Sequence, residues 1–177
     1  MKNTIFTAVF ATILATTPLV SASVPAAQTD EQRLANKIRH ELVTLPFYGV
    51  FDQMSYSLSG RKVTLFGQVT RPVLASSAAN VVKGIPGVEE VVNNIEVLPL
   101  SPNDDRLRIA LYRTIFSQAS LGRYTLGAIP PVRIIVKNGD VTLSGVVMNE
   151  MDKNMAGLFA NQVAGVFSVT NHLTVEK

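Results

Sequence analysis

A seven-residue phrase occurs twice in this chain, as VTLFGQV at 63–69 and as VTLSGVV at 141–147. The alternation of apolar side chains within each copy predicts a β-strand, yet each copy also carries a glycine, which weakens the interior of a strand. Further on, IPGVEEVVNNIEV at 85–97 aligns with VAGVFSVTNHLTV at 163–175 at the same offset of 78 residues. A constant offset over 35 residues indicates that one structural unit is present twice.

Upstream of the phrase the copies align at an offset of 73 residues, because the second copy has gained five residues in the loop SLGRYTLGAIPP. Both copies open with apolar residues spaced by four positions, which places them on one face of a helix. They are Leu34, Ile38 and Leu42 in the first copy, and Leu107, Leu111 and Ile115 in the second. We therefore expect amphipathic helices at about 30–44 and 104–118.

The other elements follow in the same order in each copy. Asn138-Gly139 predicts a two-residue hairpin, since both positions accept a positive φ, and Ser59-Gly60 predicts one less clearly. A second helix is expected from Pro72 or Glu150, followed by a last strand at about 88–97 or 166–175. The strand before each hairpin alternates, with Met54, Tyr56 and Leu58, or Val132, Ile134 and Val136, on one side.

The order αββαβ, present twice, predicts an α+β fold of two tandem units. A strand, a helix and a further strand imply a right-handed crossover to a parallel neighbour, so we expect each unit to be a three-stranded mixed sheet with two helices packed on one face. Unit one is expected at 30–98 and unit two at 104–177, joined by a linker at 99–103 that contains two prolines. Their cores are small, so we expect the units to pack together.

The first 23 residues have the pattern of a secretory signal peptide: Lys2, an apolar stretch at 4–15, and small residues at 21–23. A membrane span would need roughly 20 apolar residues, so we expect cleavage, followed by a flexible N-terminus at 24–29. The chain contains no cysteine. This predicts an exported protein that is not a lipoprotein and has no disulfides.

The charge of the chain is nearly balanced. Without Lys2, 15 basic and 13 acidic residues leave a net charge of +2. A nucleic-acid-binding domain normally carries a dense basic patch. We therefore expect no nucleic-acid partner.

The repeated motif V-x-L-x-G-x-V, followed by a helix and then G-V-x-x-V-x-N-x-[IL]-x-V, resembles the BON domain and covers nearly all of the chain after the signal peptide. The arrangement is similar to that of the dual-BON periplasmic proteins, and without a cysteine the chain resembles their soluble, osmotically inducible members. The resemblance implies location in the periplasm, binding to phospholipid membranes, and upkeep of the cell envelope under stress. The motif carries no catalytic residue.

Residues that could perform catalysis or bind a metal are few. His40 and His172 are isolated and are better explained as surface residues than as ligands. The pairs Asp30-Glu31 and Asp104-Asp105 open helices, where negative charge favours the helix dipole and caps free amides. A glycine-rich phosphate loop followed by lysine is missing from the sequence. We expect no enzyme activity, cofactor, metal or small-molecule substrate.

The glycines of the repeated motifs are interpreted as structural. Gly67 and Gly145 follow the inward residues of their strands where the second helix must cross, so a missing side chain would let backbone or helix approach closely. Gly87 and Gly165 are expected to turn the chain into the last strand of each unit.

The two copies differ on the other side of the first helix. Where unit one has Asn36, Arg39 and Val43, unit two has Ile109, Tyr112 and Phe116. A second apolar stripe needs a partner. It could be an anionic membrane surface, with arginines contacting phosphates, or unit one itself. The predicted lipid- or partner-binding residues are Arg106, Ile109, Tyr112, Arg113, Phe116, Arg123 and Tyr124.

Packing against unit one is favoured for Ile109, and both partners stay open for the aromatic and basic positions. The leading hypothesis is a non-enzymatic, membrane-associated protein that binds phospholipid surfaces and supports envelope integrity or osmotic stress tolerance. The alternative is a chaperone or protein-interaction module acting on envelope proteins. Exposure or burial of Tyr112 and Phe116 bears on this choice most directly. The sequence predicts no oligomeric state.

Overall fold

The structure, a computed structural model, describes residues 29–127 and 130–176. The predicted signal peptide at 1–23 lies outside the described residues. Unit one contains α1 (Asp30–Val43), β1 (Gln53–Ser59), β2 (Lys62–Val69), α2 (Pro72–Lys83) and β3 (Glu90–Val97). Unit two contains α3 (Pro102–Phe116), the 3₁₀ helix η1 (Gly122–Thr125), β4 (Val132–Lys137), β5 (Asp140–Val147), α4 (Glu150–Asn161) and β6 (Ser168–Val175).

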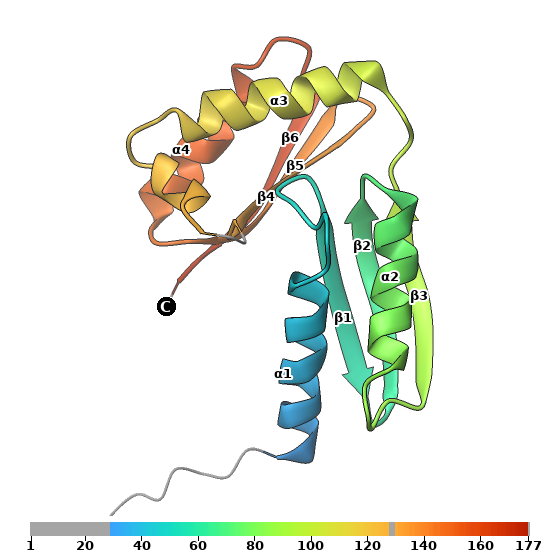
Figure 1. Ribbon diagram of the computed structural model, residues 1–177. Helices are drawn as coiled ribbons and strands as arrows, with labels where there is room; N and C mark the ends of the chain where they lie inside the picture. Colours follow the sequence, from blue (N-terminus) through green and yellow to red (C-terminus); the bar gives the residue numbers. More distant parts are fainter. Residues whose placement is uncertain (1–28, 128–129, 177) are drawn as a thin grey trace, which may run out of the picture.

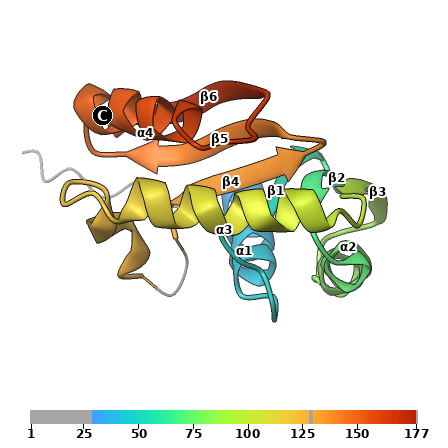
Figure 2. The ribbon, with the colours of Figure 1, turned by 90° about the horizontal axis from the view of Figure 1, so that it is seen from above.

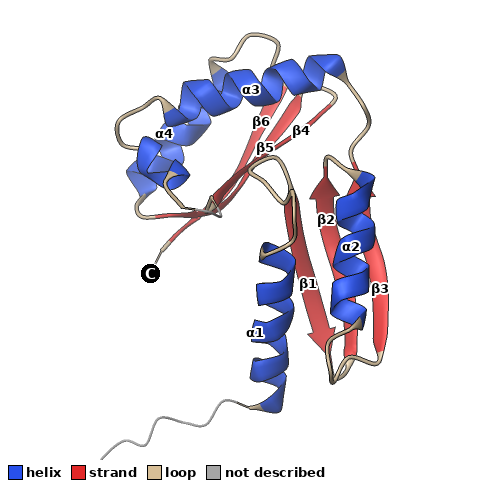
Figure 3. Cartoon of the chain, in the orientation of Figure 1, coloured by secondary structure: helices blue, strands red, loops and turns tan. Residues whose placement is uncertain are grey.

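Each unit holds one three-stranded sheet, in the orders β1-β2-β3 and β4-β5-β6. The first two strands of each sheet are antiparallel and the second and third are parallel. In both units the two helices lie against one face of the sheet (Figures 1 and 3). The predicted α+β fold of two tandem αββαβ units is therefore confirmed.

Local chemistry explains where the helices begin. Thr29 forms a capping box with Gln32 at the start of α1, and the side chains of Ser101 and Asn149 cap α3 and α4. These hydroxyl and amide oxygens accept hydrogen bonds from backbone N–H groups that the first helical turn leaves free. Pro72 stands at the first position of α2, where its missing N–H costs nothing.

Asp104 differs from the capping role expected for it. Its side chain is buried, and its carboxylate oxygens accept hydrogen bonds from the backbone N–H groups of Asn138 at 2.9 Å and Gly139 at 3.0 Å. Both turn residues have a positive φ, as the hairpin prediction requires. Because Ser101 already caps α3, Asp104 is free to fasten the β4–β5 hairpin to the start of that helix.

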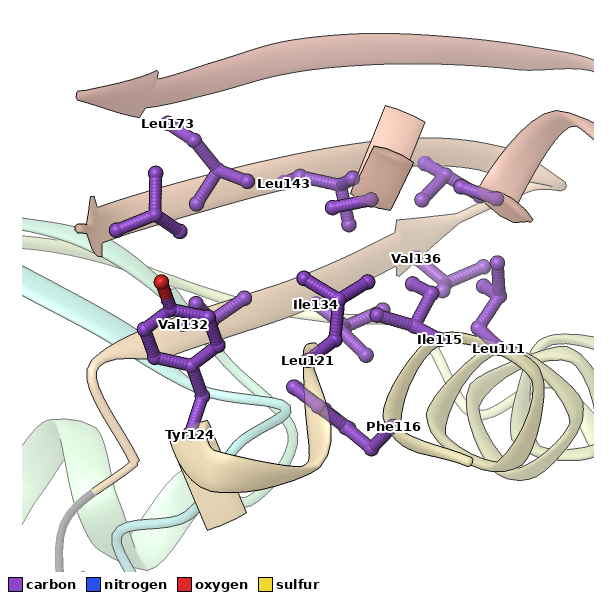
Figure 4. Packing of buried hydrophobic residues seen from close by; sticks show 14 of the residues in the cluster. Leu111, Ile115, Phe116, Leu121, Tyr124, Val132, Ile134, Val136, Leu143 and Leu173 are labelled. Atoms are coloured by element: carbon purple, nitrogen blue, oxygen red, sulfur yellow. The ribbon is translucent and has the colours of Figure 1, made fainter. Parts of the chain in front are cut away.

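Two apolar cores lie between helices and sheets, one in each unit. The core of unit two is drawn in Figure 4, where Phe116 from α3 and Tyr124 from η1 belong to the same cluster as the strand residues. Most of the largest fully buried side chains come from helices and strands: Ile38, Leu65 and Leu74 in unit one, and Leu111, Ile115, Ile134, Leu143 and Leu173 in unit two. Leu121, just before η1, and Ile135, on the outward side of β4, belong to the same group.

The two units meet at a joint, which we define as residues 48–53 of unit one and β4 of unit two. The carbonyl oxygen of Val50 accepts a hydrogen bond from the N–H of Ile134 at 2.8 Å. Arg133 donates from Nη1 to the carbonyl oxygen of Gly49 at 2.9 Å, and its guanidinium lies 4.4 Å from the centre of the Tyr48 ring. Figure 1 shows the loop before β1 reaching the second sheet.

Unit one covers part of the second sheet, at β4 and β5, on the face that points away from the helices of unit two. Ile135 and Ser144 on this face are 2% and 6% exposed, and Ser144 Oγ donates to Gln53 Oε1 at 2.7 Å. Lys137 Nζ lies 2.6 Å from Glu96 Oε1 of unit one. Hydrogen bonds from the side chains of Gln68 and Lys137 lower the pKa of Glu96.

The glycine of the repeated phrase lies against the backbone at the start of its neighbouring strand. Gly67 has φ +128°, and a Cβ added there would lie 2.0 Å from the carbonyl oxygen of Gln53. Gly145 has φ +120°, and its Cβ would lie 1.9 Å from the carbonyl oxygen of Pro131. Of the two close approaches considered, by backbone or by helix, the structure shows the backbone one, at the start of the first strand of each sheet.

We predict that Gly145→Ala destabilises the protein by about 3 kcal/mol, because the new Cβ meets a backbone oxygen and a non-glycine residue is strained at this φ. Thermal and urea unfolding would measure the loss. Gly84→Ala is the matched control, since Gly84 has a helical φ of −76° and its nearest atom would be 3.5 Å away. Equal unfolding midpoints for the two variants would contradict this explanation.

Candidate binding surface

The outer side of α3 carries three of the predicted binding residues. Ile109 is 49% exposed, and Arg106 and Arg113 on either side of it are also exposed. Positions three and four apart share one side of a helix, so the three side chains form one continuous strip. Leu107, Leu111 and Ile115 occupy the opposite side and fill the core.

The arginines of this strip have no acidic neighbour that neutralises them within the part of the chain that the structure describes. Arg106 donates to the side-chain oxygen of Asn103 at 3.3 Å, and Arg113 forms no ion pair with a described residue. In unit one, by contrast, the matching Arg33 is paired with Asp30. Asn36 occupies the position of Ile109. The apolar and cationic strip therefore belongs to unit two.

The aromatic residues of α3 pack inside the protein. Tyr112 is half-buried, with its ring 6.3 Å from that of Phe51 in unit one and 5.0 Å from that of Phe116, both in edge-to-face geometry. Phe116 is 9% exposed. Unit one thus contacts Tyr112, while Ile109, for which packing between the units had been favoured, remains accessible.

Arg123 and Tyr124 lie on η1 and are held by one carboxylate. The Tyr124 hydroxyl donates to Asp152 Oδ2 at 2.5 Å and accepts from the Met148 N–H at 2.8 Å. Arg123 Nη2 donates to the same Asp152 oxygen at 2.7 Å. The Tyr124 side chain is buried. Burial, followed by the hydrogen bond to Asp152, raises the pKa of Tyr124.

Two grooves flank the strip. One, of about 290 Å³, is lined by Tyr112, Arg113, Phe116, Ser117 and Thr125. The other, of about 410 Å³, lies where the N-terminal end of α3 passes over the end of unit one, an arrangement visible in Figures 1 and 2. We call the second the joint groove; it is lined by Phe51, Thr70, Arg71, Leu98, Pro99, Leu100, Asp105, Arg108 and Ile109.

Sequence comparison of the two copies missed Arg71 and Leu100, because neither lies on a first helix. Leu100 is 96% exposed. Its place in the sequence, as an apolar residue between two prolines of the linker, could have identified it as a candidate binding residue. Arg71 comes just before the proline that starts α2.

Among residues 29–127 and 130–176 there is no group of three or more His, Cys, Asp or Glu side chains placed to hold a metal ion. His40 and His172 are exposed. Within the same ranges, none of the helices has the length and apolar character needed to cross a membrane.

Two tandem αββαβ units, each with a glycine against the backbone beside the first strand of its sheet, define a class of small tandem-repeat α+β domains. The sequence matches the BON domain over residues 30–99 and 118–177. The chain therefore belongs to the BON domain family.

Known proteins add a more specific comparison. The chain is 29% identical over 147 residues to the outer membrane lipoprotein DolP of Haemophilus influenzae, a match that covers 80% of this chain and 72% of the relative. Together, family and relative support a non-enzymatic protein of the cell envelope. Among solved structures, CdsD of the Chlamydia trachomatis type III secretion system covers 81% of this chain and 92% of that one at 13% identity. Its TM-score of 0.33 is too low for any conclusion.

The predicted localisation, in the periplasm and not as a lipoprotein, requires correction. The similar protein from Haemophilus influenzae is an outer membrane lipoprotein. The prediction depended on the missing cysteine, and a relative of this kind contradicts it. Family membership therefore gives no support to the exclusion of a lipoprotein.

We predict that Tyr124→Phe lowers the free energy of unfolding by about 1–3 kcal/mol near neutral pH, because Asp152 and the Met148 N–H each lose a partner. The raised pKa of Tyr124 gives this difference a pH dependence. An unfolded tyrosine ionises near pH 10, where the folded protein still holds the proton. The stabilisation is therefore complete below pH 10 and is lost as the pH rises further.

Urea unfolding of wild type and Tyr124→Phe, each measured near neutral pH and above pH 10, would test this. The stability difference between the two proteins should narrow at the higher pH. A difference that stays constant across the range would show that the Tyr124 proton is not linked to folding.

Proposed function

We propose that this protein is a non-enzymatic component of the cell envelope that binds anionic phospholipid surfaces and supports envelope integrity or osmotic stress tolerance. One observation carries the proposal: Ile109 stands half exposed between two arginines that form no ion pair with any described carboxylate. An apolar side chain can enter the headgroup boundary while neighbouring cations contact phosphates. The likeness to an outer membrane lipoprotein supports a site of action at a membrane.

The expected affinity is low. An arginine near an anionic surface contributes about 1 kcal/mol, and burying the exposed half of an isoleucine contributes about 1 kcal/mol. Arg106, Arg113 and Ile109 together give roughly 3 kcal/mol, which corresponds to a dissociation constant above 1 mM. Such binding is salt-sensitive, and useful occupancy requires contacts beyond this strip.

We predict that Arg113→Glu, combined with Ile109→Ser, abolishes flotation of the protein with vesicles that contain phosphatidylglycerol at low salt. The variant loses one cation, gains an anion and loses its apolar contact, while the core residues of α3 stay unchanged. Arg39→Glu is the matched control, because Arg39 is exposed on the corresponding helix of unit one. Wild-type protein that is folded but fails to float with these vesicles would refute the proposal.

A second candidate function, binding of protein partners, is supported by the outer side of α4. Met151 and Leu158 on α4, and Met148 just before its start, are 73%, 52% and 56% exposed. Met151 and Leu158 are seven positions apart and therefore lie on the same side of the helix. Flexible methionine side chains adapt to varied apolar partners. Unit one has Val73 in place of Met151, but Asn80 in place of Leu158.

This candidate predicts that the protein suppresses aggregation of reduced insulin, followed by light scattering, in the absence of lipid. Met151→Ser combined with Leu158→Ser should remove the suppression and leave vesicle binding intact. Val73→Ser, at the matching position of α2, is the control. Equal suppression by wild type and the double variant would exclude α4 as the client-binding surface.

A further inference from the structure

We propose that the joint groove holds the phosphate headgroup of an anionic phospholipid, so that both units contribute to membrane binding. This rests on the proposed function and extends it in two respects. It gives the headgroup a defined binding site. It also places residues of unit one in contact with the lipid, whereas the α3 strip involves unit two alone.

The walls of the groove come from three parts of the chain. Phe51 belongs to the joint, Leu98 to Leu100 belong to the linker, and Ile109 belongs to α3. Leu98 is buried, whereas Leu100 is 96% exposed at the surface. The groove therefore combines an apolar floor with an exposed apolar rim, and Ile109 makes it continuous with the α3 strip.

The charge of the groove favours an anion. Its lining includes two arginines, Arg71 and Arg108, and one acidic residue, Asp105. Asp105 is paired with Arg108 at 2.5 Å. Arg71 forms no ion pair with any carboxylate of residues 29–127 or 130–176; its guanidinium lies 5.1 Å from the centre of the exposed Phe47 ring. One positive charge thus remains for a ligand.

Arg108 adds an unused donor. Its side chain is buried, and it donates from Nη2 to the carbonyl oxygen of Val136 at 2.7 Å. Its Nε has no hydrogen-bond acceptor among the described residues. A buried donor without an acceptor is unfavourable, so an ordered water molecule bound beneath the groove is expected at this atom.

The occupant that fits these features is a phosphate-containing amphiphile. The unpaired Arg71 matches the anionic headgroup, and the exposed Leu100 and Ile109 match the start of the acyl chains. A free phosphate ester offers only the first of these contacts. A lipid should therefore bind more tightly than its headgroup alone.

Arg71→Gln should weaken binding to phosphatidylglycerol vesicles about fivefold, the equivalent of the roughly 1 kcal/mol that one arginine contributes at an anionic surface. Because Arg71 is exposed, the variant should keep the wild-type melting temperature. Leu100→Ser should weaken vesicle binding as well but leave binding of glycerol phosphate unchanged. Arg61→Gln is the matched control: Arg61 is an exposed arginine of unit one outside the groove, paired with Glu89.

An NMR titration of the ¹⁵N-labelled protein with short-chain phosphatidylglycerol, below the critical micelle concentration of the lipid, tests directly whether the headgroup binds in the joint groove. The amide signals of residues 70–71, 98–100 and 108–109 should shift together. If Arg71→Gln binds vesicles as tightly as wild type, and only the Arg113→Glu, Ile109→Ser variant loses binding, the joint groove is not the headgroup site. The proposed function would remain supported in that case. Failure of wild type to bind vesicles would overturn both.

Discussion

The arrangement of the two units depends on one buried carboxylate. Asp52 is 3% exposed, and its Oδ1 accepts hydrogen bonds from the N–H of Thr70 at 2.7 Å and from its hydroxyl at 2.8 Å. Its Oδ2 accepts from the Gly49 N–H at 3.1 Å. The loop between α1 and β1 is thereby fixed to the end of β2, and its carbonyl groups face β4. The joint groove exists because this loop is held in place.

The duplicated units have taken different parts in this arrangement. Unit one provides the loop that covers β4, and its first helix carries a paired arginine at the surface. Unit two provides a helix whose outer arginines, Arg106 and Arg113, form no ion pair with a described carboxylate, and a second helix with the exposed Met151 and Leu158. Equal folds therefore present unequal surfaces: the α3 strip and the exposed side of α4 belong to unit two, whereas both units and the linker form the walls of the joint groove.

Much of the fold could be predicted because each sequence pattern, whether helix periodicity, strand alternation or turn residues, occurs once in each unit, so that each copy supports the other. The strip on α3 was found in the same way, by comparing positions. The burial of Tyr112 and Phe116 could not be predicted from a helical wheel, which shows only the positions within one helix. These side chains pack near Phe51 of unit one and near η1, which lie outside that helix. Asp104 looked like a capping residue because its hydrogen-bond partners, Asn138 and Gly139, lie more than thirty positions away.

One feature of the sequence of β4 could have predicted that another segment packs against this strand. Along β4 the inward residues are apolar, as expected, but Ile135 is an apolar residue at an outward position. An outward isoleucine beside Arg133 indicates that something covers that face of the sheet. The covering segment lies about 85 positions earlier in the chain, so neither periodicity nor local propensity could identify it.

The joint also has a consequence for the order in which the molecule is assembled. Val50 and Phe51 of unit one pack against the core of unit two, so that core is complete only when the earlier loop is in position. A chain made from its N-terminus folds its first domain first. We therefore expect the loop to form before β4 does, so that unit one serves as a template on which the second copy of the fold closes.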